Sequence, residues 1–133
     1  MAKKILVLDD DPNIRKAVKV LLESEGFKVK TAQDWQECLT KLQKEKPDLI
    51  LLDILMPTIV GISALRLIKE SIPQTKVIML SVLGSKIYRQ LSSELGAVDF
   101  ITKPFDNRDL IQRIKRALGM NEVLSEKQIE AEA

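Results

Sequence analysis

The 133-residue chain is long enough for one domain with a sizeable core, and its composition excludes several kinds of function. It has no histidine, so it carries no Ser-His or Cys-His catalytic unit, no zinc site of the usual kind and no phosphohistidine of its own. The formal net charge is only +2, and the lysines are scattered among carboxylates rather than clustered with aromatic residues, so we expect no direct nucleic-acid binding.

The sequence also predicts where the protein resides. No apolar stretch approaches the ~20 residues that a membrane-spanning helix needs. The chain begins with two lysines and a short apolar run that meets aspartates at once, which is unlike a secretory signal. Cys38 is the single cysteine, so no intramolecular disulfide can form. We therefore expect a cytoplasmic protein without membrane contact.

Short apolar runs alternate with longer segments of helical period, which is typical of a parallel sheet covered by helices on both faces. The strands are predicted at residues 4–8, 28–31, 49–53, 76–81 and 98–101. The predicted fold is α/β, a doubly wound, flavodoxin-like three-layer sandwich. The natural order for five such units is 2-1-3-4-5, although the sequence alone does not determine it.

Helix ends are marked by glycines and by one Asp-Pro pair. Gly26, Gly96 and Gly119 each follow a helical pattern, where a left-handed cap is expected. Asp11 precedes Pro12 and is predicted to cap the first helix. We expect one domain over residues 1–119, followed at 120–133 by an acidic tail or the start of a linker.

Polar side chains lie at the ends of three predicted strands and in the loop that follows a fourth. In a doubly wound sheet ligands bind beyond the carboxyl ends of the strands. Asp9 and Asp10 end the first strand there, Asp53 ends the third, Ser81 ends the fourth, and Lys103 follows the fifth. Crowded carboxylates repel one another unless a cation neutralises them, and hard oxygen ligands suit Mg²⁺ or Mn²⁺. Solvated loop aspartates remain an equal alternative for the first pair.

Asp53 is the strongest candidate for chemistry. It closes the apolar run 49–52, where an unpaired charge is costly. A carboxylate beside a divalent cation can attack phosphorus, because the metal screens the repulsion between two anions. Ser81 and Lys103 are then suited to bind phosphoryl oxygens, although each taken alone is an ordinary strand-end hydroxyl or surface cation.

In their order and spacing over residues 3–118, these motifs closely resemble the receiver domains of two-component response regulators, including the chemotaxis regulators. The resemblance rests on the segments Val7-Leu8-Asp9-Asp10-Asp11, Leu51-Leu52-Asp53-Ile54-Leu55-Met56-Pro57, Gly61, Met79-Leu80-Ser81, Leu95-Gly96-Ala97 and Lys103-Pro104-Phe105.

The resemblance implies a phosphoacceptor and a metal site. Asp53 would accept a phosphoryl group from a phosphohistidine on a sensor histidine kinase or histidine phosphotransfer protein. Asp10, Asp53 and the backbone carbonyl of Leu55 would ligate Mg²⁺, with Asp9 acting through water. Ser81 and Lys103 would contact the phosphoryl oxygens. The resemblance also implies a cis bond before Pro104.

The resemblance further implies a conformational switch. Ser81 would move toward the phosphoryl group while Phe100 turns inward, remodelling the face of the fourth helix, fifth strand and fifth helix, through which a homodimer could form. A core phenylalanine is an equally compatible interpretation of Phe100. Val82 stands where the family usually has a smaller residue, which predicts slower phosphotransfer. Leu55 and Leu83 are apolar and cannot orient a hydrolytic water, which predicts a long-lived phosphoryl group.

Two other functions compete with this hypothesis. A phosphatase of the haloacid-dehalogenase type would use Asp9 as nucleophile and Asp11 as acid, but Asp11 is better explained as a cap and no segment supplies a substrate-covering domain. A phosphate-independent interaction module is disfavoured because all five site residues are retained. We therefore predict a phosphoacceptor switch that promotes its own phosphotransfer and slow autodephosphorylation, and that regulates an output domain or a partner.

Overall fold

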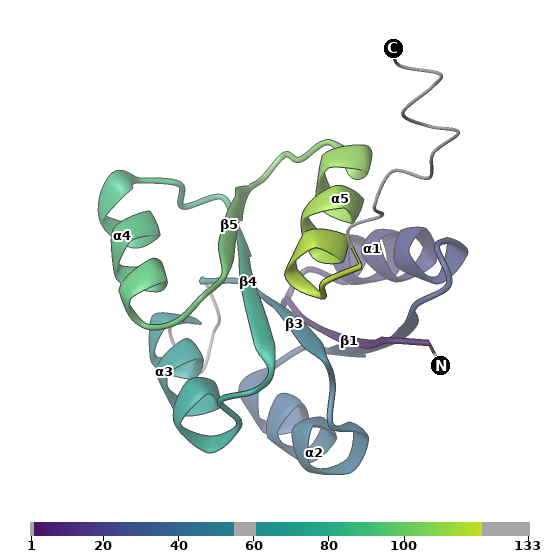
Figure 1. Cartoon of the computed structure of the whole chain (residues 1–133), viewed down its shortest axis with the longest axis horizontal. Helices are drawn as coiled ribbons and strands as arrows, with labels where there is room; N and C mark the ends of the chain where they lie inside the picture. The colour runs from purple at the N-terminus through teal and green to yellow at the C-terminus, as the bar shows by residue number, and fades with distance from the viewer. Residues whose placement is uncertain (1, 55–60, 121–133) are drawn as a thin grey trace.

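The computed structural model describes residues 2–54 and 61–120, and these contain one five-stranded sheet (Figure 1). All four neighbouring strand pairs are parallel, and the strand order is β2-β1-β3-β4-β5. The strands are β1 (Lys4–Leu8), β2 (Lys28–Ala32), β3 (Leu49–Leu52), β4 (Lys76–Ser81) and β5 (Asp99–Thr102). The predicted fold and strand order are confirmed.

Three strands differ from the prediction by one residue at one or both ends. β2 continues to Ala32, β3 stops at Leu52, and β5 runs from Asp99 to Thr102 rather than over 98–101. The sheet's hydrogen bonds decide these ends, and apolar character alone does not report them. As a result Asp53 lies just beyond β3, in the loop at the sheet's carboxyl edge.

Five helices of the described residues form the two outer layers. They are α1 (Pro12–Ser24), α2 (Trp35–Glu45), α3 (Gly61–Ser71), α4 (Lys86–Glu94) and α5 (Asn107–Ala117). Within the described segments, none of them is long and apolar enough to cross a membrane. The predicted tail or linker lies outside the described residues, except for Met120.

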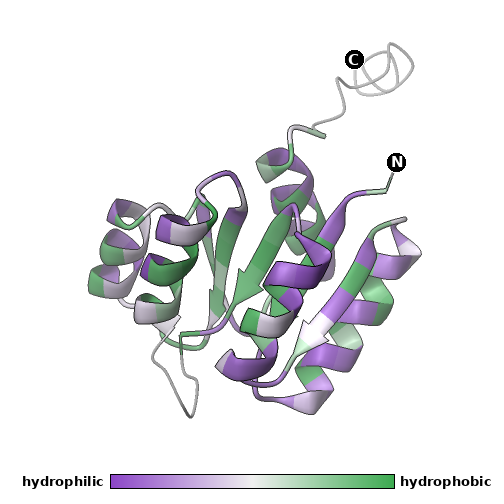
Figure 2. Ribbon diagram, turned by 90° about the horizontal axis from the view of Figure 1, so that it is seen from below, coloured by the Kyte–Doolittle hydropathy of each residue, from purple (hydrophilic) through white to green (hydrophobic). Residues whose placement is uncertain are grey.

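Two cores lie on opposite faces of the sheet because successive side chains of a strand point in opposite directions. On β1, Leu6 and Leu8 pack with residues of α2 and α3, whereas Ile5 and Val7 pack with residues of α1 and α5. Figure 2 shows the hydrophobic strands between two layers of helices whose outer faces are more hydrophilic. Both faces of the central strands are therefore covered, which explains their nearly uniform aliphatic sequence.

The helix ends follow the predicted chemistry, with one addition. Asp11 is the N-cap of α1, where its side chain accepts a hydrogen bond from the Asn13 amide. The three predicted cap glycines all have positive φ. The C-cap of α2 is instead Lys46, a non-glycine residue with φ 47°. No glycine marks this end, so the sequence could not show a left-handed cap there.

Candidate functional site

Strand pairing brings Asp9 and Asp53 to the same edge of the sheet. β1 and β3 are neighbours with Leu8 beside Leu52, and the Asp53 amide donates to the Leu8 carbonyl at 3.1 Å. Asp9 and Asp53 therefore follow paired residues. Their exposures are only 2% and 5%, although each carries a carboxylate. Burial of this kind is costly unless the charges are compensated.

Lys103 supplies part of that compensation. Its amide donates to the Ser81 carbonyl at 2.9 Å, which fixes the loop after β5 against the end of β4. Its ammonium donates to Asp9 Oδ2 at 2.5 Å and to Asp53 Oδ2 at 3.2 Å. The Lys103-Pro104 peptide bond is cis. One cation thus bridges two buried carboxylates that come from different strands.

The pKa values of two of these groups reflect their burial and pairing. Burial raises the pKa of Asp9 above its usual range, although the hydrogen bonds from Lys103 and from the Asp11 amide oppose the shift. Burial by itself lowers the pKa of Lys103, but the hydrogen bond to Asp9 and the charges of Asp9 and Asp53 outweigh it, so the net shift is upward. Lys103 is therefore held as an ammonium ion.

Asp10 completes a group of carboxylates that fits a divalent cation. One carboxylate oxygen from each of Asp9, Asp10 and Asp53 lies within 4.8 Å of the other two. Asp10 is exposed, so the group opens to solvent on one side. One ammonium cannot neutralise three carboxylates, and hard oxygen donors with open positions are the ligands that Mg²⁺ and Mn²⁺ accept. Leu55, whose carbonyl was predicted as a further ligand, lies outside the described residues.

Ser81 and Phe100 lie on β4 and β5, the two strands that follow β3 in the sheet. Ser81 is fully buried at the end of β4, and its hydroxyl accepts a hydrogen bond from the Leu83 amide at 3.2 Å. The Phe100 side chain is 7% exposed and packs in the core that lies beneath α2 and α3. The Arg89 guanidinium carbon lies 5.2 Å from the centre of its ring. The ring is therefore directed inward in this structure.

The site contacts of two residues could not be predicted from the sequence. Arg15 on α1 donates from Nη1 to the Asp9 carbonyl at 2.7 Å. Gly61 begins α3 so close to the acceptor loop that a Cβ there would lie 2.2 Å from the Asp53 carbonyl oxygen. Both contacts involve main-chain atoms, which every residue carries, so neither residue type nor spacing in the sequence indicates them. Gly61 was singled out only through the family motif.

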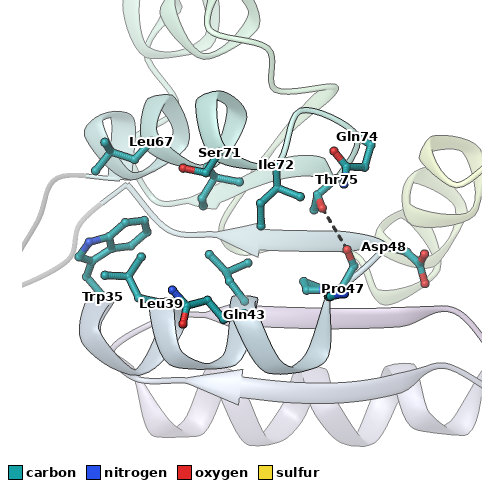
Figure 3. Close-up of a pocket in the computed structure, with 13 residues that line it drawn as sticks. Trp35, Leu39, Gln43, Pro47, Asp48, Leu67, Ser71, Ile72, Gln74 and Thr75 are labelled. Carbon is teal, nitrogen blue, oxygen red and sulfur yellow. Dashed lines mark hydrogen bonds between the residues drawn. The ribbon is translucent and has the colours of Figure 1, made fainter.

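A groove in the described surface lies away from these carboxylates. It has a volume of about 710 Å³ and lies between α2 and α3, and Figure 3 shows its apolar side chains, including Trp35, Leu39 and Leu67, with polar residues at its end. There the Thr75 hydroxyl donates to the Pro47 carbonyl at 3.1 Å (Figure 3). The groove contains none of the clustered carboxylates, so the chemistry of the donors, and not the size of the hollow, identifies the site.

Comparisons with known proteins agree with this geometry. The family model of the response regulator receiver domain matches residues 5–115. Transcriptional regulatory protein CpxR of Escherichia coli (strain K12) is 44% identical over 115 residues, which are 86% of this chain and 49% of that protein. Alkaline phosphatase synthesis transcriptional regulatory protein PhoP of Bacillus subtilis (strain 168) is 38% identical over 123 residues, which are 92% of this chain and 51% of that protein. The chain spans about half the length of these curated relatives.

Solved structures of receiver domains share the fold over almost their whole length. The CheY-like receiver domain protein from Methanospirillum hungatei JF-1 superposes with a TM-score of 0.86 at 35% identity, covering 92% of this chain and 98% of that one. The BeF3-activated DrrB receiver domain superposes with a TM-score of 0.82 at 37% identity, covering 90% and 99%. The chain therefore belongs to the response regulator receiver domain family, which is the phosphoacceptor domain of two-component signalling systems.

Proposed function

We propose that Asp53 is the phosphoacceptor, and that its partner is a phosphohistidine on a sensor histidine kinase or a histidine phosphotransfer protein. The observation that carries the proposal is the Lys103 ammonium, which bridges the buried carboxylates of Asp9 and Asp53. In the transfer, an Asp53 carboxylate oxygen forms a bond to phosphorus while the P–N bond to the donor imidazole breaks. The imidazole leaves with the bonding electron pair and takes up a proton.

We propose that Mg²⁺ or Mn²⁺ is held by Asp10, Asp53 and the backbone carbonyl of Leu55, and by Asp9 through water. The three clustered carboxylates support this assignment because they combine hard oxygen donors with an excess of negative charge. When bound, the cation supplies charge that screens the acceptor carboxylate from the incoming phosphoryl oxygens. The buried aspartates are positioned before binding by main-chain hydrogen bonds to neighbouring strands.

Lys103 and Ser81 are proposed to bind the phosphoryl oxygens. Lys103 already lies 3.2 Å from Asp53, so its ammonium needs only a small movement to pair with an oxygen carried by that residue. Ser81 is fully buried at the neighbouring strand end, and its hydroxyl proton can be redirected toward the same group.

The same contacts support a switch that involves Ser81 and Phe100. If phosphorylation draws the Ser81 hydroxyl toward Asp53, the inward position of Phe100 is favoured, and the face of α4, β5 and α5 changes with it. This face is proposed to regulate an output domain or a partner and to form the contact of a homodimer. We do not assign nucleic-acid binding to residues 1–119, which we propose act as a receiver unit in the cytoplasm, with residues 120–133 as a tail or linker.

We propose that the protein catalyses only the transfer of a phosphoryl group to its own Asp53 and the slow hydrolysis of that group. The apolar Leu55 and Leu83 cannot orient a hydrolytic water, so autodephosphorylation is slow. A haloacid-dehalogenase-type phosphatase would need Asp11 as its acid, and the Asp11 side chain instead caps α1.

Two substitutions separate these functions. Asp53→Asn is expected to abolish incorporation of labelled phosphate from acetyl phosphate in the presence of Mg²⁺. Asp11→Asn should leave incorporation intact, because asparagine is as good an N-cap as aspartate. Labelling of Asp53→Asn together with loss of labelling in Asp11→Asn would overturn the proposal and favour the phosphatase.

A further inference from the structure

Arg15 connects α1 to the main chain of the carboxylate cluster. It lies one helical turn after the Asp11 cap, where it is partly buried. Its Nη1 donates to the carbonyl oxygen of Asp9 at 2.7 Å. That carbonyl belongs to the peptide group that joins Asp9 to Asp10, two of the three clustered carboxylates. A charged donor to a main-chain oxygen is among the stronger hydrogen bonds in proteins.

Asp9 is held at every polar group that it has. Its amide donates to the Ala32 carbonyl on β2 at 3.2 Å, its Oδ1 accepts from the Asp11 amide at 2.9 Å, and its Oδ2 accepts from Lys103. The carbonyl is the remaining group, and Arg15 holds it. Three of these four contacts come from residues outside the immediate turn or from another strand, so the turn after β1 is fixed from several sides.

Asp10 has no comparable support of its own. Its side chain is exposed and makes no hydrogen bond within residues 2–54 and 61–120, yet one of its oxygens lies within 4.8 Å of oxygens of Asp9 and Asp53. A peptide group is planar, so a fixed Asp9 carbonyl also fixes the Asp10 amide and the direction from which its side chain departs. Without the Arg15 bond, this peptide could rotate and mutual repulsion would turn Asp10 away from the other carboxylates.

We propose that Arg15 is a positioning residue of the cation site, which holds the Asp9-Asp10 peptide so that the Asp10 carboxylate faces Asp9 and Asp53 before a divalent cation arrives. The inference rests on the proposed cation site. The positioning role and the charge of Arg15 have opposite effects on cation affinity, so an experiment can separate them. Positioning raises the affinity, whereas a guanidinium close to the site repels a cation and lowers it. The Glu37 pKa is lowered mainly by the hydrogen bond from Lys41 and only weakly by the charge of Arg15.

The test compares Arg15→Met with Lys16→Met. Lys16 is the next residue of α1, it is exposed, and its replacement removes the same charge from nearly the same place. Mg²⁺ is titrated into each ¹⁵N-labelled protein, and the amide signals of Asp10 and Asp11 give the dissociation constant. We expect the dissociation constant of Arg15→Met to rise about tenfold, the effect typical of residues that orient metal ligands. Lys16→Met should stay within about twofold of the wild type, as expected for an exposed charge.

Two further measurements make the outcome decisive. Arg15→Lys keeps a charged donor and should recover part of the affinity, and it replaces Arg15→Met if that variant does not fold. Labelling of Arg15→Met by acetyl phosphate should return to the wild-type rate when Mg²⁺ is saturating, because only the cation requirement has changed. A dissociation constant equal to or below that of Lys16→Met would overturn the role of Arg15. If the wild-type Asp10 and Asp11 signals do not respond to Mg²⁺, the proposed cation site itself is wrong.

Discussion

Replacing Lys103 by methionine tests the electrostatic balance of the site. Asp9 and Asp53 are 2% and 5% exposed, and Lys103 is the one cation that contacts both within the described residues. Removing one partner of a buried ion pair costs ~3–5 kcal/mol. The site opens to solvent at Asp10, so we expect a cost at or just below the lower limit of that range, about 2–3 kcal/mol. For a domain of this size, that corresponds to a fall in Tm of about 6–9 °C.

The assay is urea unfolding at pH 7, first with a chelator and then with MgCl₂. With the chelator, the free energy of unfolding of Lys103→Met should fall by this amount, whereas Lys30→Met, an exposed strand lysine, should change by less than ~0.5 kcal/mol. With Mg²⁺, the variant should gain more stability than the wild type, because its carboxylates lack their ammonium partner. A tenfold tighter affinity would narrow the difference by ~1.4 kcal/mol. Equal midpoints in chelator, or equal gains with Mg²⁺, would refute this reasoning.

Three further predictions concern other parts of the site and core. Gly61→Ala should cost roughly 1–3 kcal/mol in thermal unfolding, because the new Cβ meets the Asp53 carbonyl oxygen at 2.2 Å; an unchanged Tm would show that the loop yields easily. Burial raises the pKa of the Cys38 thiol to about 12, so a thiol reagent at pH 8 should react only after unfolding, when about a tenth of the thiols ionise. Rapid labelling of the native protein would contradict this. Val82→Ala should speed labelling by acetyl phosphate if the 61%-exposed Val82 side chain restricts access, and unchanged rates would count against that role.

Cys38 also has a consequence for stability at alkaline pH. Its folded pKa lies above that of the unfolded thiol, so its protonated form is favoured by folding. The resulting contribution to stability is complete below pH 9 and is lost as the pH rises from 9 toward 12. Cys38→Ala should remove this part of the pH dependence, which equilibrium unfolding at pH 8 and pH 10.5 can measure.

Much of the fold could be predicted because its signals are local. A strand buried on both faces must be apolar throughout, as Leu49–Leu52 is, and an amphipathic helix repeats its apolar residues with its own period. Cap residues such as Asp11 satisfy amides only two or three residues away. The rule that parallel strands present their carboxyl ends at one edge then placed Asp9, Asp10 and Asp53 in one group.

Only the tertiary structure decided which atoms come into contact at the site. Lys103 is separated from Asp9 by 94 residues and from Asp53 by 50, and only the packed sheet shows that one ammonium reaches both carboxylates. The Arg15 contact with the Asp9 carbonyl and the close approach of Gly61 to Asp53 involve main-chain atoms, which carry no residue-specific signal. Residue type and period determine which side chains gather at the edge of the sheet. The distances, the burial and the pairing of charges there arise only when the layers pack.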